Sequence, residues 1–228
     1  MFTPSHHRAC AHPVVASQKS ARLRQDLAKW STVKPVTTAE PAQFREAVAA
    51  MNATTVRPEI ELGPIRPPQR LAPFSYALGA EVRHPESAIV PEQSEGDAFG
   101  RLILLHDPEG AEAWDGTMRL VAYVQADLDS SEAVDPLLPE VAWSWLVDAL
   151  EANTENITAL GGTVTATTSV RYGDISGPPR AHQLELRASW TATTLDLGPH
   201  VTAFCAVLEH AAGLPPAGVT DLKSRTRA

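Results

Sequence analysis

The chain has 228 residues, 43% of them hydrophobic, which is enough for one sizeable globular core. It lacks an apolar run of about 18 residues, so we expect no transmembrane helix. The net charge of −8 is uneven, because residues 1–38 are basic and residues 39–220 hold most of the carboxylates. Such an acidic body repels a phosphate backbone, which argues against nucleic-acid binding by the domain itself.

The two ends of the chain differ from its body. Residues 1–38 have few large apolar side chains and no sustained pattern, which predicts a basic, disordered tail. A targeting segment or an over-extended reading frame would give the same composition. We expect a single domain over residues 39–216 and a second basic tail over residues 217–228.

Cysteine usage and the start of the chain bear on location. No apolar segment of the signal-peptide kind follows Met1, and Cys10 and Cys205 form neither a CxxC pair nor a metal-binding spacing. We therefore expect a cytoplasmic protein without a disulfide, a metal site or a cofactor.

The first half of the body predicts a helix and then strands. Pro41 opens a helix over residues 41–52, with Phe44 and Met51 on its apolar face. Prolines crowd the segment that follows, which places a short strand near Ile60 at a sheet edge or in an ordered arm. Further strands are expected at residues 76–82, 100–106 and 118–125, with loops at 84–97 and 107–114.

Residues 135–151 predict a helix that is apolar on nearly every side. Asp135 is suited to the N-cap and Pro136 to the first helical position. Apart from one narrow polar stripe, its side chains are apolar, with Trp143 and Trp145 pointing in different directions. This pattern predicts a helix flanked by a sheet and another helix, or by a sheet and a second subunit.

The remaining pattern fixes the fold class. After a loop at residues 153–162, two alternating strands are expected at 163–172 and 183–192, followed by a helix at 199–212 that Gly213 ends. Runs of strands between helices, with clean alternation, indicate an α+β fold. We predict a twisted, mainly antiparallel sheet of about five to six strands, with two long helices on one face.

Several phrases resemble an uncharacterised bacterial family, the domain of unknown function 3000, over about residues 40–216. The resemblance rests on Val56–Glu59, Pro68–Pro73, Gly100–Pro108, Trp114–Thr117, Val141–Leu146, Leu184–Trp190 and Ala211–Pro215. It implies no activity and no catalytic residue. Genes of this family tend to lie near a ribonuclease D-like gene, so the resemblance also implies an accessory role in RNA metabolism as an alternative.

One candidate acid–base cluster lies where the third strand ends. His106 and Asp107 enter the loop, and Asp115 and Arg119 follow it. The structural alternative is turn chemistry, since Asp107–Pro108–Glu109–Gly110 is itself a turn sequence. His106, Asp107 and Arg119 are the candidate catalytic residues.

Candidate binding residues lie in the same loop and in the proline-rich arm. Trp114 and Asp115 form a candidate recognition element, or else a plug that packs on the sheet. Arg66 and Arg70 make a basic patch on an arm that docks a partner or is fixed against its own domain.

No Gly-rich phosphate loop, HExxH or GxSxG motif is present. We therefore expect a non-catalytic protein-interaction or regulatory module, acting on an unknown protein partner or by self-association. The alternatives are an enzyme or small-molecule-binding protein with a pocket near His106, and RNA binding through the basic tail.

Overall fold

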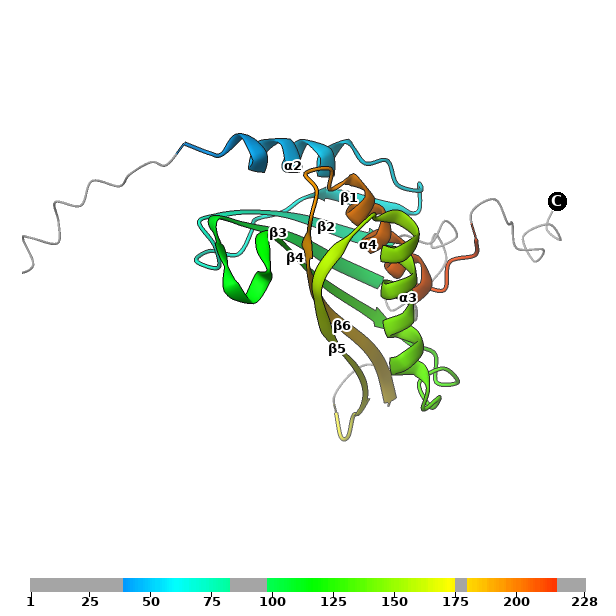
Figure 1. Cartoon of the computed structure of the whole chain (residues 1–228). Coiled ribbons are helices and arrows are strands. Elements are labelled where there is room, and N and C mark those ends of the chain that lie inside the picture. Colours follow the sequence, from blue (N-terminus) through cyan, green and yellow to red (C-terminus); the bar gives the residue numbers. More distant parts are fainter. Residues whose placement is uncertain (1–38, 83–97, 175–179, 217–228) are drawn as a thin grey trace, which may run out of the picture. The chain divides into compact units, whose positions relative to one another are not determined.

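A computed structural model describes residues 39–82, 98–174 and 180–216. All of its helices and strands belong to one compact unit, Glu40–Ala228. Figure 1 labels the α-helices and the strands. In chain order, the elements are α2 (Ala42–Ala53), β1 (Ile60–Pro64), β2 (Phe74–Val82), β3 (Ala98–Ala111), the short 3-10 helix η1 (Glu112–Trp114), β4 (Gly116–Asp127), α3 (Leu138–Asn153), β5 (Ile157–Val170), β6 (Arg180–Ala192) and α4 (Gly198–Ala211).

The strands form a six-stranded sheet in the order β1-β2-β3-β4-β6-β5, with every neighbouring pair antiparallel. Strands β1 to β4 follow the chain as a meander, and β6 then lies between β4 and β5. The β4–β6 register runs from Arg119 opposite Thr191 to Asp127 opposite Gln183. The α+β class and the antiparallel sheet are thus confirmed.

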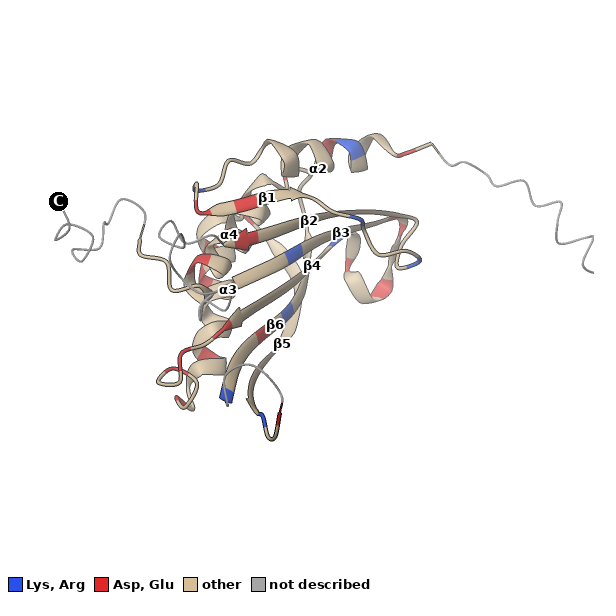
Figure 2. Cartoon of the chain, turned by 180° about the vertical axis from the view of Figure 1, so that it is seen from behind, with Lys and Arg blue, Asp and Glu red and all other residues tan. Residues whose placement is uncertain are grey.

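The three α-helices of the described residues lie on one face of the sheet (Figure 1). Helix α4 contacts β2, β3 and β4, α3 contacts β5 and α4, and the shorter α2 contacts α4. The sequence predicted two long helices on this face, and α2 adds a third. Seen from behind, no described helix covers the opposite side, which we call the open face (Figure 2).

The core lies between the sheet and these helices. Alternate residues of the central strands point into it, so Leu102, Leu120 and Trp190 are almost fully buried. Phe204 and Leu208 of α4 are buried in the same core cluster as these side chains. The two tryptophans of α3 diverge as predicted: Trp143 lies over Gly162 of β5, whereas Trp145 stacks on His210 of α4.

Several boundaries differ from the sequence prediction, and three of them have an identifiable local cause. Asp135 does not cap α3, because its carboxylate accepts a hydrogen bond from Leu137 N within a turn and the helix begins at Leu138. Strand β3 continues through the expected loop to Ala111, with a register shift after His106. Strand β5 begins at Ile157, within the expected loop, because a bulge between Thr158 and Gly161 accommodates the unpaired residues and lets the pairing with β6 continue on both sides.

Candidate functional site

His106 is a buried side chain of the core. Its ring packs against those of Phe44 of α2 and Phe74 of β2, with centroids 5.9 and 6.0 Å away, and the residue is 1% exposed. Nδ1 lies 2.9 Å from the Thr117 carbonyl oxygen, so the proton on Nδ1 is donated to that carbonyl. Nε2 has no hydrogen-bond partner among the described residues.

Arg119 lies on the opposite side of the sheet from His106. Strand register places it opposite Leu105, one residue out of phase with His106, so the two side chains leave opposite faces. Its guanidinium donates to the carbonyl of Ala159 at 2.9 Å and to the hydroxyl of Ser189 at 2.7 Å. Partial burial lowers the pKa of this guanidinium from its ordinary value. Arg119 therefore holds the β5 bulge, where Ala159 has a φ of 49°.

Asp107 lies in the irregular part of β3, directly after the register shift at His106. Its carboxylate accepts a hydrogen bond from Glu109 N at 3.1 Å. We expect Asp107→Ala to lower the free energy of unfolding by about 1 kcal/mol through loss of this hydrogen bond. Urea unfolding of the two proteins would measure it, and an unchanged midpoint would contradict the structural role.

Trp114 and Asp115 form the end of the β3–β4 hairpin. The Thr191 hydroxyl donates a short hydrogen bond to the Trp114 carbonyl, which fixes η1 against β6. Asp115 is exposed and forms the C-cap of η1 in a left-handed backbone conformation, with a φ of 54°. Trp114 is half-buried, which leaves part of its ring accessible.

Arg66 and Arg70 belong to the arm that joins β1 to β2. The arm is fixed at Ile65, whose N–H donates to the Ala77 carbonyl at 2.9 Å. Arg66 lines an open-face groove of about 690 Å³, over the small side chains of β2 and beside Arg101 and Phe99 of β3. Arg70 adopts a left-handed backbone with a φ of 69°. Among the described residues, no hydrogen bond, ion pair or ring contact joins these arginines to the β3–β4 hairpin.

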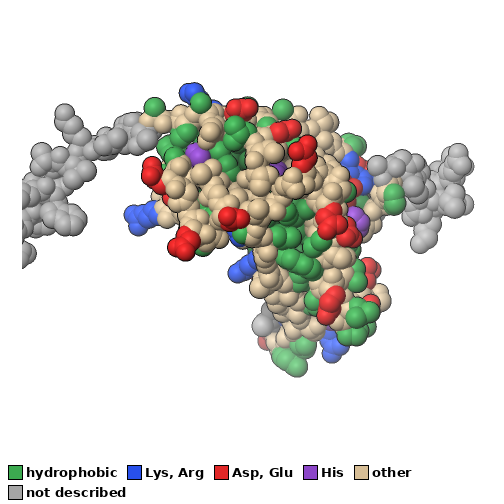
Figure 3. All heavy atoms as spheres, in the orientation of Figure 1, with side chains coloured by type: hydrophobic (Ala, Val, Ile, Leu, Met, Phe, Trp, Pro, Cys, Tyr) green, Lys and Arg blue, Asp and Glu red, His purple; other side chains and the backbone are tan. Residues whose placement is uncertain are grey.

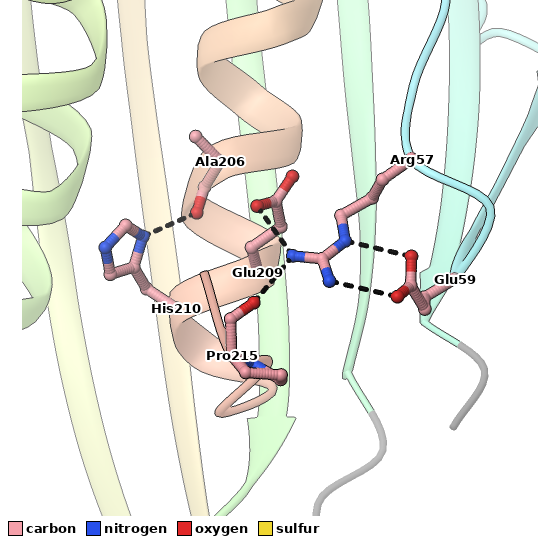
Figure 4. Close-up of polar contacts among 6 residues, drawn as sticks. All are labelled: Arg57, Glu59, Ala206, Glu209, His210 and Pro215. Carbon is pink, nitrogen blue, oxygen red and sulfur yellow. Dashed lines mark hydrogen bonds and ion pairs between the residues drawn. The ribbon is translucent and has the colours of Figure 1, made fainter. Parts of the chain in front are cut away.

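Arg57 anchors the other end of the proline-rich segment (Figure 4). Arg57 makes a two-pronged contact with Glu59 at 3.0 Å and reaches Glu209 of α4 and the Pro215 carbonyl, each at 3.1 Å. These contacts raise the pKa of Arg57, and hydrogen bonding by Arg57 lowers that of the Glu59 carboxyl to about 2. The network ties the segment before β1 to the end of α4.

The clearest candidate site is a groove of about 410 Å³ between α3 and α4, which we call the α3–α4 groove. Its lining is Asp127, Leu128, Asp129, Glu132, Asp135, Leu138, Val141, Trp145, His210, Ala211, Ala212 and Gly213. An apolar floor is thus bordered by four carboxylates. Figure 3 views the helix-covered face and shows carboxylates and apolar side chains next to one another there.

An aromatic pair, Trp145 and His210, forms part of the lining of the α3–α4 groove. The rings of Trp145 and His210 are stacked with their centroids 5.7 Å apart. His210 Nδ1 lies 2.7 Å from the Ala206 carbonyl, which fixes the plane of that ring (Figure 4). Val141, which lines the groove, is 43% exposed, and Leu137, one turn earlier along the chain, is 62% exposed. Exposed apolar side chains grouped in this way are typical of interaction surfaces.

Two carboxylates of the groove are free to meet a ligand. Asp127 lies 3.3 Å from the Gln183 amide, and Asp135 is bound to the turn before α3. Within the described part of the chain, the side chains of Asp129 and Glu132 make no hydrogen bond or ion pair. The sequence prediction missed this groove, although the acidic run 127–135 and the apolar outer side of the next helix were its signal.

The other reactive side chains are withdrawn from solvent. Cys205 is a buried free thiol whose pKa is raised to about 12 by burial. His200 is 2% exposed and accepts a hydrogen bond from Trp190 Nε1. Residues 39–82, 98–174 and 180–216 contain no cluster of three or more potential metal ligands.

No helix in the described ranges is long and apolar enough to cross a bilayer. The expected basic tails, with Cys10, lie outside the described residues.

Comparison with known proteins yields one match. The family model described as "Protein of unknown function (DUF3000)" matches residues 40–220, which is most of the chain. The family resemblance predicted from the sequence is thus confirmed. No curated protein and no solved structure matches the chain.

Proposed function

We propose that this chain, which belongs to the DUF3000 family of unknown function, is a non-catalytic protein-interaction module. In this proposal the α3–α4 groove binds a positively charged segment of a partner protein that also carries apolar side chains. The observation that carries the proposal is one exposed groove in which an apolar floor, an aromatic pair and unpaired carboxylates meet.

The chemistry of the groove selects the charge of the partner. Asp129 and Glu132 offer carboxylates to Lys or Arg, and their field adds to that of a strongly acidic body. Long-range attraction of this kind raises the association rate of a cationic partner and repels an acidic one.

The apolar part of the groove supplies affinity. Trp145 is half-buried, so its ring can accept the stem of a Lys or Arg side chain and a cation over its face. Val141 and Leu137 extend the apolar surface along α3 and would be covered by a partner. A buried aromatic anchor within a charged rim is the usual composition of an interaction hot spot.

The non-catalytic assignment is supported by the placement of the candidate acid–base residues. His106 is enclosed by aromatic rings on the helix side, whereas Arg119 lies on the open face. Asp107 is engaged by its own turn. These three side chains do not converge on one pocket.

The test is calorimetric titration of the full chain with two synthetic peptides, one alternating Arg with Leu and the other alternating Glu with Leu. We expect the Arg peptide alone to bind, with an affinity that falls as salt rises. Trp145→Ala should weaken binding about tenfold or more through loss of the aromatic anchor.

Charge variants complete the test. Asp129→Asn combined with Glu132→Gln should also weaken binding, whereas Glu46→Gln combined with Glu109→Gln, which removes two exposed carboxylates outside the groove, should have little effect. Equal binding of both peptides, or an affinity unchanged in Trp145→Ala, would exclude the proposed site.

A further inference from the structure

Strand β5 forms an unpaired edge of the sheet. It pairs with β6 on one side, and no described strand pairs with its other side. In an antiparallel pair, about every second residue directs both its N–H and its C=O outward. Most side chains from Gly161 to Val170 are exposed, so along this stretch the edge lies open within the described unit.

This edge lacks the usual protection against strand pairing. Exposed edges are commonly blunted by Lys, by inward-facing charges, by Pro or by bulges. The 14 residues of β5 contain no charged residue and no proline. The single register shift, between Thr158 and Gly161, lies near the start of the strand and leaves the register continuous from Gly161 to Val170.

The open part of β5 is complementary to itself in the antiparallel direction. A two-fold axis near Thr165 would place Thr163 opposite Thr167 and Val164 opposite Ala166. Val164 pairs with the buried Leu186 of β6, so Val164 and Ala166 lie on the helix side of the sheet and the threonines on the open face. Thr–Thr pairs and pairs of small apolar residues are favourable cross-strand contacts.

Charge also favours a second copy at this place. The strongly acidic bodies of two copies repel one another, and contact is least unfavourable where carboxylates are absent. Strand β5 provides an uncharged surface along its whole length. On the helix side, α3 carries the half-buried Trp143 over Gly162, and Val147 shares that side of the helix.

We infer that two copies of this chain associate through β5, with antiparallel pairing of the two edges into one continuous sheet. Each edge then satisfies its outward N–H and C=O groups, and the apolar side chains that α3 extends toward the edge, Trp143 among them, lose exposure to solvent. The inference is independent of the α3–α4 groove and of the partner proposed for it.

The test is analytical ultracentrifugation of the full chain over a wide concentration range. We expect a reversible monomer–dimer equilibrium, with a dimer of twice the chain mass of 24.5 kDa. Thr165→Lys combined with Thr167→Lys places like charges across the two-fold axis and should raise the dissociation constant at least about tenfold.

The matched control carries the same two substitutions elsewhere. Thr194→Lys combined with Thr202→Lys changes the charge equally at exposed positions outside β5 and should leave the dissociation constant unchanged. Circular dichroism melting would establish that each variant is folded. Hydrogen exchange should show that the amides of residues 161–170 gain protection as the concentration rises.

Several results would overturn the inference. The wild-type chain could remain a monomer at every concentration, or the dimer could survive the β5 lysines, or the control variant could dissociate equally. The Arg peptide is titrated separately into the same variants. A negative result for peptide binding in the α3–α4 groove can therefore be distinguished from a negative result for dimerisation through β5.

Discussion

Gly162→Ala is expected to lower the free energy of unfolding by about 2 kcal/mol, whereas Gly161→Ala should change it by less than about 0.5 kcal/mol. A Cβ atom at Gly162 would collide with the backbone carbonyl of Arg187 and lie 2.9 Å from the Cα of Ala188, both on β6. It would also lie 2.8 Å from the Trp143 ring. Backbone on one side and a packed indole on the other leave little room for relaxation.

Gly161 is the matched control for this prediction. A Cβ atom there would have nothing within 4 Å, although the residue is the immediate neighbour on the same strand. Urea unfolding followed by circular dichroism, at one protein concentration, would measure both variants. Equal stability of the two variants would contradict the close packing of β5, β6 and α3.

The second large effect is a loss of stability on mild acidification, centred on His200. This imidazole is buried and accepts a hydrogen bond from Trp190 Nε1 at 3.1 Å, so it is neutral when folded. Burial lowers its pKa from 6.5 to about 4, against a smaller opposing effect of Asp196. In the unfolded chain this imidazole is protonated below pH 6.5, whereas in the folded chain it stays neutral down to about pH 4.

Stability should therefore be constant with respect to this group above pH 6.5 and fall between pH 6.5 and 4. The accumulated loss is about 3 kcal/mol, at about 1.4 kcal/mol per pH unit. His200→Gln keeps an acceptor for Trp190 without a titrating ring, so its stability should depend less steeply on pH in this range.

Urea unfolding at half-unit pH steps would measure this slope. The depressed pKa of Glu59 acts in a separate window, between pH 4.5 and 2. A His182→Gln variant, which removes a half-exposed imidazole, controls for the loss of a histidine elsewhere. Identical slopes for wild type and His200→Gln would show that another group causes the acid sensitivity.

Much of the fold could be predicted from the sequence because one-sided burial leaves a periodic pattern. The alternation through Leu184, Leu186 and Trp190 identified β6, and the stripe through Phe204 and Leu208 identified α4. Residues 157–162 were predicted as a loop, because two glycines and a bulge interrupt the alternation of β5. The strand is held there by Arg119 of β4, a long-range contact that no local pattern records.

The candidate sites were harder to predict because they depend on which strand face each residue occupies. His106 and Arg119 lie near one another in the sequence but leave opposite faces of the sheet. The α3–α4 groove joins the acidic run after β4 to the last turn of α4, about 80 residues later. Trp145 and His210 meet only once α3 and α4 are packed together.

The strand order has a consequence for how the chain folds. The β1–β4 meander and the β5–β6 pair are each local, but the seam between β4 and β6 closes a long loop that contains α3 and β5. Closing that loop costs chain entropy before any seam contact is gained. Helix α4 follows β6 in the chain, but it packs on β2, β3 and β4, which lie on the other side of the β4–β6 seam. During synthesis, the apolar face of β2, β3 and β4 that α4 covers in the folded protein therefore stays exposed until α4 has emerged from the ribosome.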